Sequence, residues 1–231
     1  MAYLFVIIGI MMVSMIVYMY YYFKVTKEIR LALKLATSLW FVLLGIAAIF
    51  IQTDKNIKFS IIMLLGLIFG FLGDAVLGLR RTNSESNKAF FCVGLLAFML
   101  GHILYSLAYF SFSSYPQYIY FLVALAVTVV LIVVVELTKV KLGYLRAPNY
   151  LYTYISSFLL TTIVLAVIDG FTLGKTLALL GIVSFISSDV ILNYLYFKEL
   201  SPAKFKIYKY INIVTYYVGQ MLIALSIYFL M

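Results

Sequence analysis

The sequence predicts an all-α membrane protein with eight transmembrane helices. Of its 231 residues, 66% are hydrophobic and 11% are charged, whereas soluble domains average roughly 45–50% apolar and about 25% charged residues. Long apolar stretches follow one another with short polar breaks, which leaves no room for a soluble domain of about 50 residues or more. We therefore expect residues 1–231 to form a single polytopic membrane domain.

Eight stretches have the length of a membrane span, which takes about 20 mostly apolar residues for a hydrocarbon core of roughly 30 Å. They cover residues 3–23, 32–52, 59–79, 89–110, 117–137, 149–168, 174–197 and 207–230. Strands of a membrane barrel would be about half as long, so these lengths favour helices. The first stretch lacks a basic start and a small-residue cleavage site, and we interpret it as a retained span rather than a signal peptide.

The positions of the basic residues predict the orientation in the membrane. The loops after the first, third, fifth and seventh spans hold Lys24, Lys27, Arg30, Lys34, Arg80, Arg81, Lys88, Lys139, Lys141, Arg146, Lys198, Lys204, Lys206 and Lys209. The other loops hold only Lys55, Lys58 and Lys175. Because basic loops stay in the cytoplasm, we expect these odd loops to be cytoplasmic and both termini to lie outside, in a bacterial cell membrane.

Composition also limits the partners and the metal chemistry. The basic loops account for the net charge of +9, so we expect contact with membrane lipids and not with nucleic acid. The single cysteine, Cys92, excludes a disulfide framework and a multi-cysteine metal site. His102 is the only histidine, and with no second His or Cys to join it we expect no zinc site. We expect no metal and no cofactor.

Asp74 lies inside the third span, in the stretch 71–78, with no basic neighbour before Arg80. A charge inside the bilayer costs a few kcal/mol or more, so an acid at that depth is by default a functional residue with a partner. Asp189 in the seventh span is the matching acid. At a helical rise of 1.5 Å per residue, the two acids lie about 9 and 13 Å from the inner ends of their spans. They therefore share the cytoplasmic half of the bilayer.

The two halves of the chain resemble each other. Asp74 and Asp189 both begin a D-x-x-L pattern and lie 115 residues apart, and Gly101 and Gly219 both begin a G-(H/Q)-x-L pattern and lie 118 residues apart. These spacings suit a four-plus-four parallel internal repeat, whose twofold axis would run along the membrane normal and make the two acids partners across it. Matches this short also arise by chance in an apolar chain, so the repeat is one of two interpretations.

Further polar residues lie in the spans around the two acids. Asn193 is one turn from the second acid on the same helix face, and Tyr216 enters the same depth from the eighth span. His102 and Gln220 lie about 20 Å from the inner end, with Tyr105 one turn above the histidine. Hydrocarbon cannot satisfy these groups, so we expect a buried, partly wet cavity that opens towards the inner leaflet.

Four motifs carry a resemblance to a known family. They are Gly73-Asp74, Gly101-His102-x-x-Tyr105, Ser188-Asp189-x-x-Leu192 and Thr215-Tyr216-Tyr217-x-Gly219-Gln220. With these motifs in order, eight spans and short loops, the sequence resembles the YhhN-like lysoplasmalogenase family along nearly its whole length. Lys34-Leu35 stands where the family has a Lys-Pro pair, which leaves the role of Lys34 open.

The resemblance implies a reaction and a set of residues. The reaction is hydrolysis of the vinyl ether bond of lysoplasmalogen, a single-chain lysophospholipid, to a fatty aldehyde and a glycerophospho-base. The resemblance makes Asp74 and Asp189 the catalytic pair. The substrate-binding residues that we expect around them are His102, Tyr105, Asn193, Tyr216, Gln220 and Lys34.

Two carboxylates are suited to this chemistry. A vinyl ether is cleaved when its β-carbon is protonated, which leaves an oxocarbenium ion that water captures. Two carboxylates in one low-dielectric pocket cannot both ionise cheaply, so they can divide the tasks of proton donor and water activation, as in paired-carboxylate glycosidases. Such a pair titrates as a unit, and only its deeper position favours Asp189 as the acid.

The same residues allow other interpretations. A small proton-coupled transporter uses intramembrane acids and pseudo-symmetry equally well, although all three prolines lie in loops or at the start of a span, unlike those of broken transporter helices. A lipid-binding protein without catalysis is a further alternative, with both acids paired to Lys34 or to backbone. His102 can bind phosphate, relay protons or pack between helices.

Overall fold

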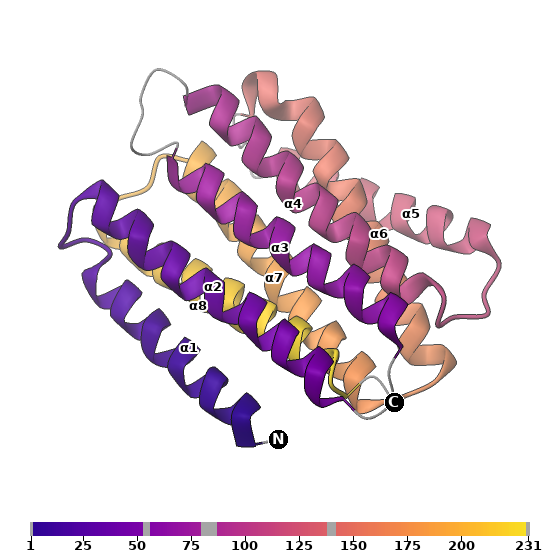
Figure 1. The fold of residues 1–231 in the computed structure, drawn as a ribbon. Coiled ribbons are helices and arrows are strands. Elements are labelled where there is room, and N and C mark those ends of the chain that lie inside the picture. The colour runs from indigo at the N-terminus through magenta and orange to yellow at the C-terminus, as the bar shows by residue number, and fades with distance from the viewer. Residues whose placement is uncertain (1, 53–55, 80–86, 138–141, 230–231) are drawn as a thin grey trace.

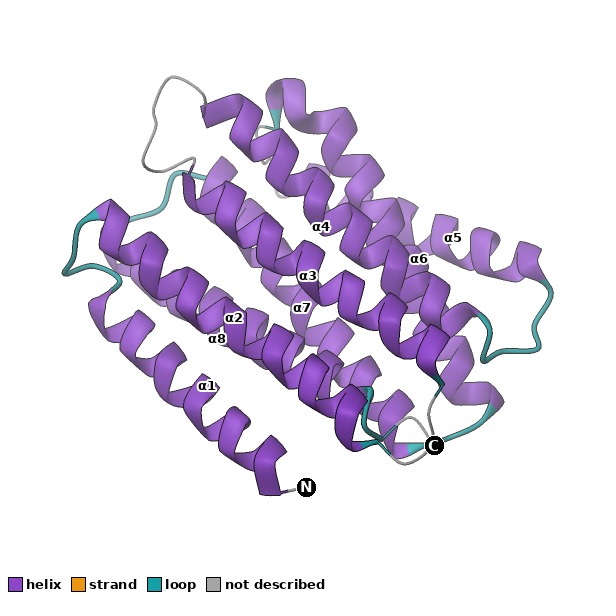
Figure 2. Ribbon diagram, in the orientation of Figure 1, coloured by secondary structure: helices purple, strands orange, loops and turns teal. Residues whose placement is uncertain are grey.

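The computed structural model of the chain describes residues 2–52, 56–79, 87–137 and 142–229, which form helices joined by short loops (Figure 2). The elements are α1 (Ala2–Tyr21), α2 (Lys27–Ile51), α3 (Ile57–Leu79), α4 (Asn87–Phe110), α5 (Gln117–Leu137), the 3₁₀ turn η1 (Gly143–Leu145), α6 (Arg146–Asp169), α7 (Leu173–Phe197) and α8 (Pro202–Ser226). Seven of the described helices, α1 to α7, are long and apolar enough to cross a membrane. The all-α membrane fold predicted from the sequence is confirmed.

Two helices begin five residues earlier than predicted, α2 at Lys27 and α8 at Pro202. Proline in the first turn, after the extended Ser201, is a common helix start. Hydropathy ends a span where charges begin, whereas these two helices continue through their charged residues. Basic residues that we had placed in loops therefore lie on helices: Lys27, Arg30 and Lys34 on α2, and Lys204, Lys206 and Lys209 on α8.

Six helices form a closed ring in the order α2, α3, α4, α6, α7 and α8, each packed against the next. Outside the ring, α1 packs on α2 and α8, and α5 packs on α6, so that α1 and α5 lie on opposite sides of the bundle (Figure 1). The start of α1 and the end of α8 lie at the same end of the bundle (Figure 1).

The side of the membrane on which the termini lie stays a prediction. It rests partly on basic residues outside the described part of the chain, namely Lys55, Arg80, Arg81, Lys139 and Lys141. The described helices show the expected inversion of polarity, with large apolar side chains exposed on α1 and α5, which suits lipid contact. Polar side chains are buried inside the ring instead, among them Ser38, Asp74, His102, Ser188, Asn212 and Gln220.

The two halves of the chain contain matching close helix crossings. Where α3 meets α4, a Cβ atom on Gly101 would lie 3.2 Å from the Gly66 carbonyl oxygen. Where α7 meets α8, a Cβ atom on Gly181 would lie 2.8 Å from the Gly219 carbonyl oxygen. The two pairs are related by the same offsets, 115 and 118 residues, as the sequence patterns. The repeat remains a prediction, and it now has equivalent crossings in both halves.

Replacing Gly181 with alanine is expected to lower the free energy of unfolding by about 1–3 kcal/mol, because the added methyl group meets the α8 backbone, which has to move away. The matched control is Gly9→Ala on α1, where nothing lies within 4 Å of the added Cβ and stability should hold or rise slightly. Thermal unfolding of both variants in one detergent measures the difference. Equal losses of stability would show that the close crossing is not what requires glycine at position 181.

Candidate active site

Asp74 is buried in α3 and bound by two residues of α2. Its Oδ1 lies 2.7 Å from Lys34 Nζ, and the Ser38 hydroxyl lies 2.5 Å from its Oδ2. Lys34 and Ser38 are one helical turn apart, which places both on the face of α2 that packs against α3. The Asp74 side chain is only 3% exposed. The direct partner of this carboxylate is thus a lysine of the neighbouring helix, and not the second acid that the sequence predicted.

Asp189 in α7 has different surroundings. The Tyr152 hydroxyl of α6 donates a hydrogen bond of 2.6 Å to its Oδ2. His102 Nε2 lies 3.9 Å from the same oxygen, too far for a hydrogen bond. The Asp189 side chain is 12% exposed. This carboxylate therefore has a phenol as its direct partner, with no lysine or arginine at ion-pair distance among the described residues.

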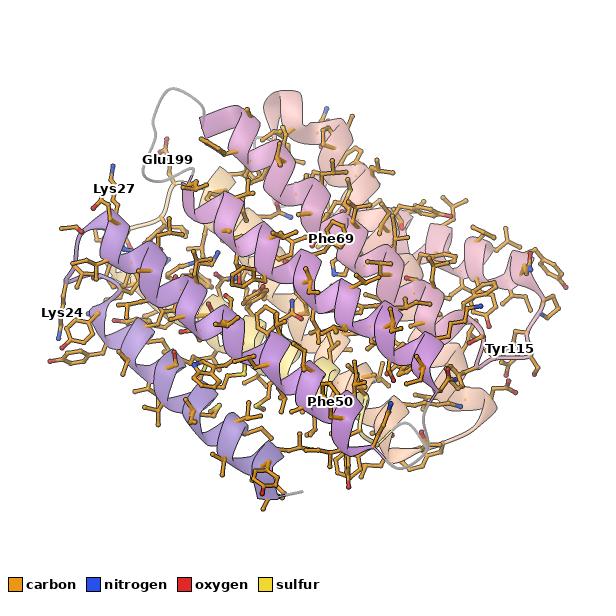
Figure 3. The ribbon with its side chains drawn as sticks, in the orientation of Figure 1. Lys24, Lys27, Phe50, Phe69, Tyr115 and Glu199 are labelled. Atoms are coloured by element: carbon orange, nitrogen blue, oxygen red, sulfur yellow. The ribbon has the colours of Figure 1, made fainter. Side chains whose placement is uncertain are left out.

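Both carboxylates line one cavity between α2, α3, α7 and α8. The cavity lies at the end of the bundle where α2 begins, beside Lys27 (Figure 3). Its volume of about 60 Å³ is enough for several water molecules, each of which needs roughly 10–15 Å³ on this measure. The structure thus brings the two acids that the sequence singled out to one cavity.

The cavity also contains more basic than acidic side chains. Lys27, Arg30 and Lys34 line it from α2, and Lys209 lines it from α8. The three α2 residues follow helical spacing and so share one face. Among the residues that the structure describes, no group of three or more His, Cys, Asp or Glu side chains could hold a metal ion.

Comparison with known proteins identifies the family. The family model described as YhhN matches residues 29–227, a range that includes both acids and the helices of the ring except the first two residues of α2. The chain belongs to the YhhN family. This family includes lysoplasmalogenases, and the resemblance drawn from the four sequence motifs is confirmed. No curated protein and no solved structure matches the chain.

Two more of the predicted site residues lie at this end of the YhhN bundle. Tyr216 lines the cavity, with its hydroxyl 3.4 Å from the Gly70 carbonyl oxygen. Asn193 lines a second, smaller cavity that also borders Asp189, and its Oδ1 accepts a hydrogen bond of 2.8 Å from Asn149 Nδ2. Asn193 therefore stands beside the second acid, but in a different compartment from Asp74.

Three predicted substrate-binding residues line neither cavity. Tyr105 donates a hydrogen bond of 3.1 Å to Gln220 Oε1, which links α4 to α8 in the buried interior. His102 is fully buried between the rings of Tyr152 and Phe185, at centroid distances of 5.2 and 4.8 Å. Neither of its ring nitrogens has a hydrogen-bond partner among the described atoms. These positions indicate that Tyr105 and Gln220 pack helices together, whereas His102 lies next to Asp189.

The prediction missed four residues that surround the acids. Ser38 had a signal, because it follows Lys34 by one turn in an apolar span. Arg30 and Lys209 were taken for loop residues, since both precede the apolar part of their helices. Tyr152 had no signal that sets it apart from the other 20 tyrosines of the chain. Its role depends on how α6 is rotated against α7, which no local pattern encodes.

Proposed function

We propose that this member of the YhhN family hydrolyses the vinyl ether bond of a lysoplasmalogen by acid–base catalysis with Asp74 and Asp189. The observation that carries the proposal is that both carboxylates line one cavity while only one of them is paired with a cation. Unequal surroundings are what separate the acid from the base in a pair of carboxylates.

The different partners suggest different roles. The Lys34 ammonium lies 2.7 Å from Asp74 Oδ1, and we assign to this ion-paired carboxylate the supply of negative charge near a developing cation and the orientation of water. Asp189 receives a hydrogen bond from Tyr152 on Oδ2, which leaves Oδ1 to carry a proton. We therefore assign the proton donor to Asp189, which is also the more exposed of the two carboxylates.

The reaction then proceeds in three steps. Asp189 transfers its proton to the β-carbon of the vinyl ether, and the C=C π electrons form the new C–H bond, leaving an oxocarbenium ion. Water adds to the cationic carbon and loses a proton to a carboxylate, which gives a hemiacetal. The hemiacetal hydroxyl then loses its proton to a carboxylate while the C–O bond to glycerol breaks and the glycerol oxygen takes up a proton from a carboxylic acid, so that one water is consumed and a fatty aldehyde and a glycerophospho-base are released.

Aldehyde release tests the proposal. Purified protein in detergent is incubated with lysoplasmalogen, beside a saturated 1-O-alkyl lysophospholipid as control, which has no double bond to protonate. We expect aldehyde from the vinyl ether lipid alone. Absence of aldehyde, together with proton-dependent uptake by proteoliposomes, would instead support a transporter that uses the same acids.

Tyr152→Phe is expected to lower kcat by about tenfold or more, because the Tyr152 hydroxyl stabilises the carboxylate that Asp189 becomes when it gives up its proton. The ring stays in place beside His102, so the substitution should leave KM and thermal stability nearly unchanged. Tyr154→Phe is the matched control, since Tyr154 lies on the same helix and lines neither cavity. An equal loss of kcat in both variants would contradict the role given to the Tyr152 hydroxyl.

A further inference from the structure

The two cavities meet at Asp189 and differ in character. The residues that border both of them are Asp189, Leu77, Phe98, Leu192 and Tyr196. The first cavity contains basic side chains from α2 and α8, whereas the second is lined by α3, α4, α6 and α7 and has Asp189 as its one charged side chain in the described part of the chain. A molecule that reaches from one cavity into the other therefore passes this carboxylate.

In the predicted repeat, α2 and α8 correspond to α6 and α4. The two cavities then occupy equivalent places in the two halves of the chain, and the halves differ in what they offer. One half presents cations to the shared space, and the other presents aromatic and aliphatic side chains. A ligand with an anionic or polar group at one end and a hydrocarbon at the other would match these two cavities.

We infer that the two cavities hold a lysophospholipid in one orientation, with its phosphate against Arg30 and Lys209 and the carbons next to its glycerol ether in the apolar cavity. The inference deepens the proposed function, on which it rests for the bond that lies at Asp189. The binding orientation itself requires no reaction.

The cationic side of the first cavity is suited to an anion. The Arg30 guanidinium and the Lys209 ammonium both approach the Tyr22 ring, at 4.8 and 5.4 Å from its centroid. Neither Lys27 nor Arg30 forms an ion pair with a described carboxylate, and the buried Nε of Arg30 has no hydrogen-bond partner among the described atoms. Like charges gathered in this way attract an anion, and the planar guanidinium matches the geometry of phosphate.

The spacing along α2 also matches the proposed ligand. Arg30 precedes Lys34 by four residues, which is about 6 Å along the helix axis. In an extended glycerophospholipid, the phosphorus and the ether oxygen at the other end of glycerol are separated by five bonds, or roughly 6 Å. A phosphate at Arg30 therefore places the ether at the depth of Lys34 and Asp74.

The apolar cavity has walls that side chains can open. Among the described residues, no Cα atom of α4 comes within 8 Å of one of α7. Aromatic side chains bridge this space instead, with Phe91 against Tyr196 at 5.4 Å and Phe98 against Phe185 at 5.9 Å between ring centroids. Side chains and not helix backbones therefore close this space, so a hydrocarbon that enters it has to displace these rings.

Equilibrium binding of two lipids tests the orientation. The probes are a labelled 1-O-alkyl-glycerophosphoethanolamine and a 1-O-alkylglycerol with the same chain, and neither has a vinyl ether, so binding is measured whether or not the protein hydrolyses lysoplasmalogen. We expect the phosphate-bearing lipid to bind about tenfold or more tightly than the alkylglycerol. In Arg30→Gln, the ratio of the two affinities should fall close to one. Arg30→Lys should retain part of it. The matched control is Lys24→Gln, which removes a charge at the same end but outside the cavity.

A second variant and a second probe complete the test. Leu95→Trp fills the apolar cavity and should weaken both lipids equally, while bound alkylglycerol in Arg30→Gln shows that this variant is folded. An unchanged ratio in Arg30→Gln, or unchanged alkylglycerol binding in Leu95→Trp, would overturn the orientation. Inorganic phosphate should compete only weakly with the lipid. If it competed as strongly as unlabelled lipid, the ligand of the basic side chains would be free phosphate and not a lipid head group.

Discussion

Asp189→Asn is expected to reduce aldehyde release from lysoplasmalogen by about 10²–10⁴-fold, the usual contribution of a general acid. The amide keeps the size of the side chain, and its oxygen can still accept the Tyr152 hydrogen bond, so the site should keep its shape. The amide of Asn has no acidic proton that it could transfer to the β-carbon of the vinyl ether. Steady-state kinetics of the purified variant measure the loss, which should fall on kcat with little change in KM.

Asp169→Asn is the matched control for this substitution. Asp169 ends α6 and accepts hydrogen bonds from the backbone and hydroxyl of Ser114, at 2.6 and 2.9 Å, in an exposed position. It makes the same chemical change far from both cavities, so activity should stay within a factor of a few. Activity of Asp189→Asn close to that of an active Asp169→Asn control would remove Asp189 from the role of proton donor.

The sequence predicted the fold because membrane burial leaves few alternatives. A run of about 20 apolar residues can satisfy its backbone in lipid only as a helix, so the existence and order of the helices followed from run length. The starts of α2 and α8 did not, because their charged first turns look like loops. The first turn of α2 holds Arg30, which lines the cavity, so the error in this helix boundary and the missed site residue have one cause. Lys209 lies farther along α8, inside the predicted span, and was counted with the loop because of its charge.

The two acids were predictable, and their partners were only partly so. The cost of a carboxylate in the bilayer marks Asp74 and Asp189 from sequence alone. The sequence favoured each acid as the partner of the other, with pairing to Lys34 as the alternative. In the structure Lys34 pairs with Asp74 alone, and Tyr152 binds Asp189. Contacts between helices depend on how each helix is rotated about its axis. In a span that is apolar all round, the apolar periodicity is too weak to predict this rotation.

The pairing of Lys34 with Asp74 predicts the largest effect on stability. Lys34→Met keeps the length of the side chain but leaves the Asp74 carboxylate, 3% exposed, without its cation. Breaking a buried ion pair from one side typically costs about 3–5 kcal/mol, and we expect the lower end of this range because Lys34 is 20% exposed. Thermal unfolding in detergent measures the loss. Lys175→Met is the control, since Lys175 is also buried but bonds the Gly170 carbonyl oxygen and strands no carboxylate when removed.

The double variant Lys34→Met/Asp74→Asn separates stability from catalysis. With the charge on Asp74 removed as well, no buried carboxylate is left without a partner, so the free energy of unfolding should recover by about 1 kcal/mol or more relative to Lys34→Met alone. Aldehyde release should not recover, because the negative charge that we assign to the developing oxocarbenium ion is gone. Recovery of both properties would mean that the Lys34–Asp74 pair only holds α2 against α3. Recovery of stability without activity is the result expected if the charge of Asp74 takes part in the reaction.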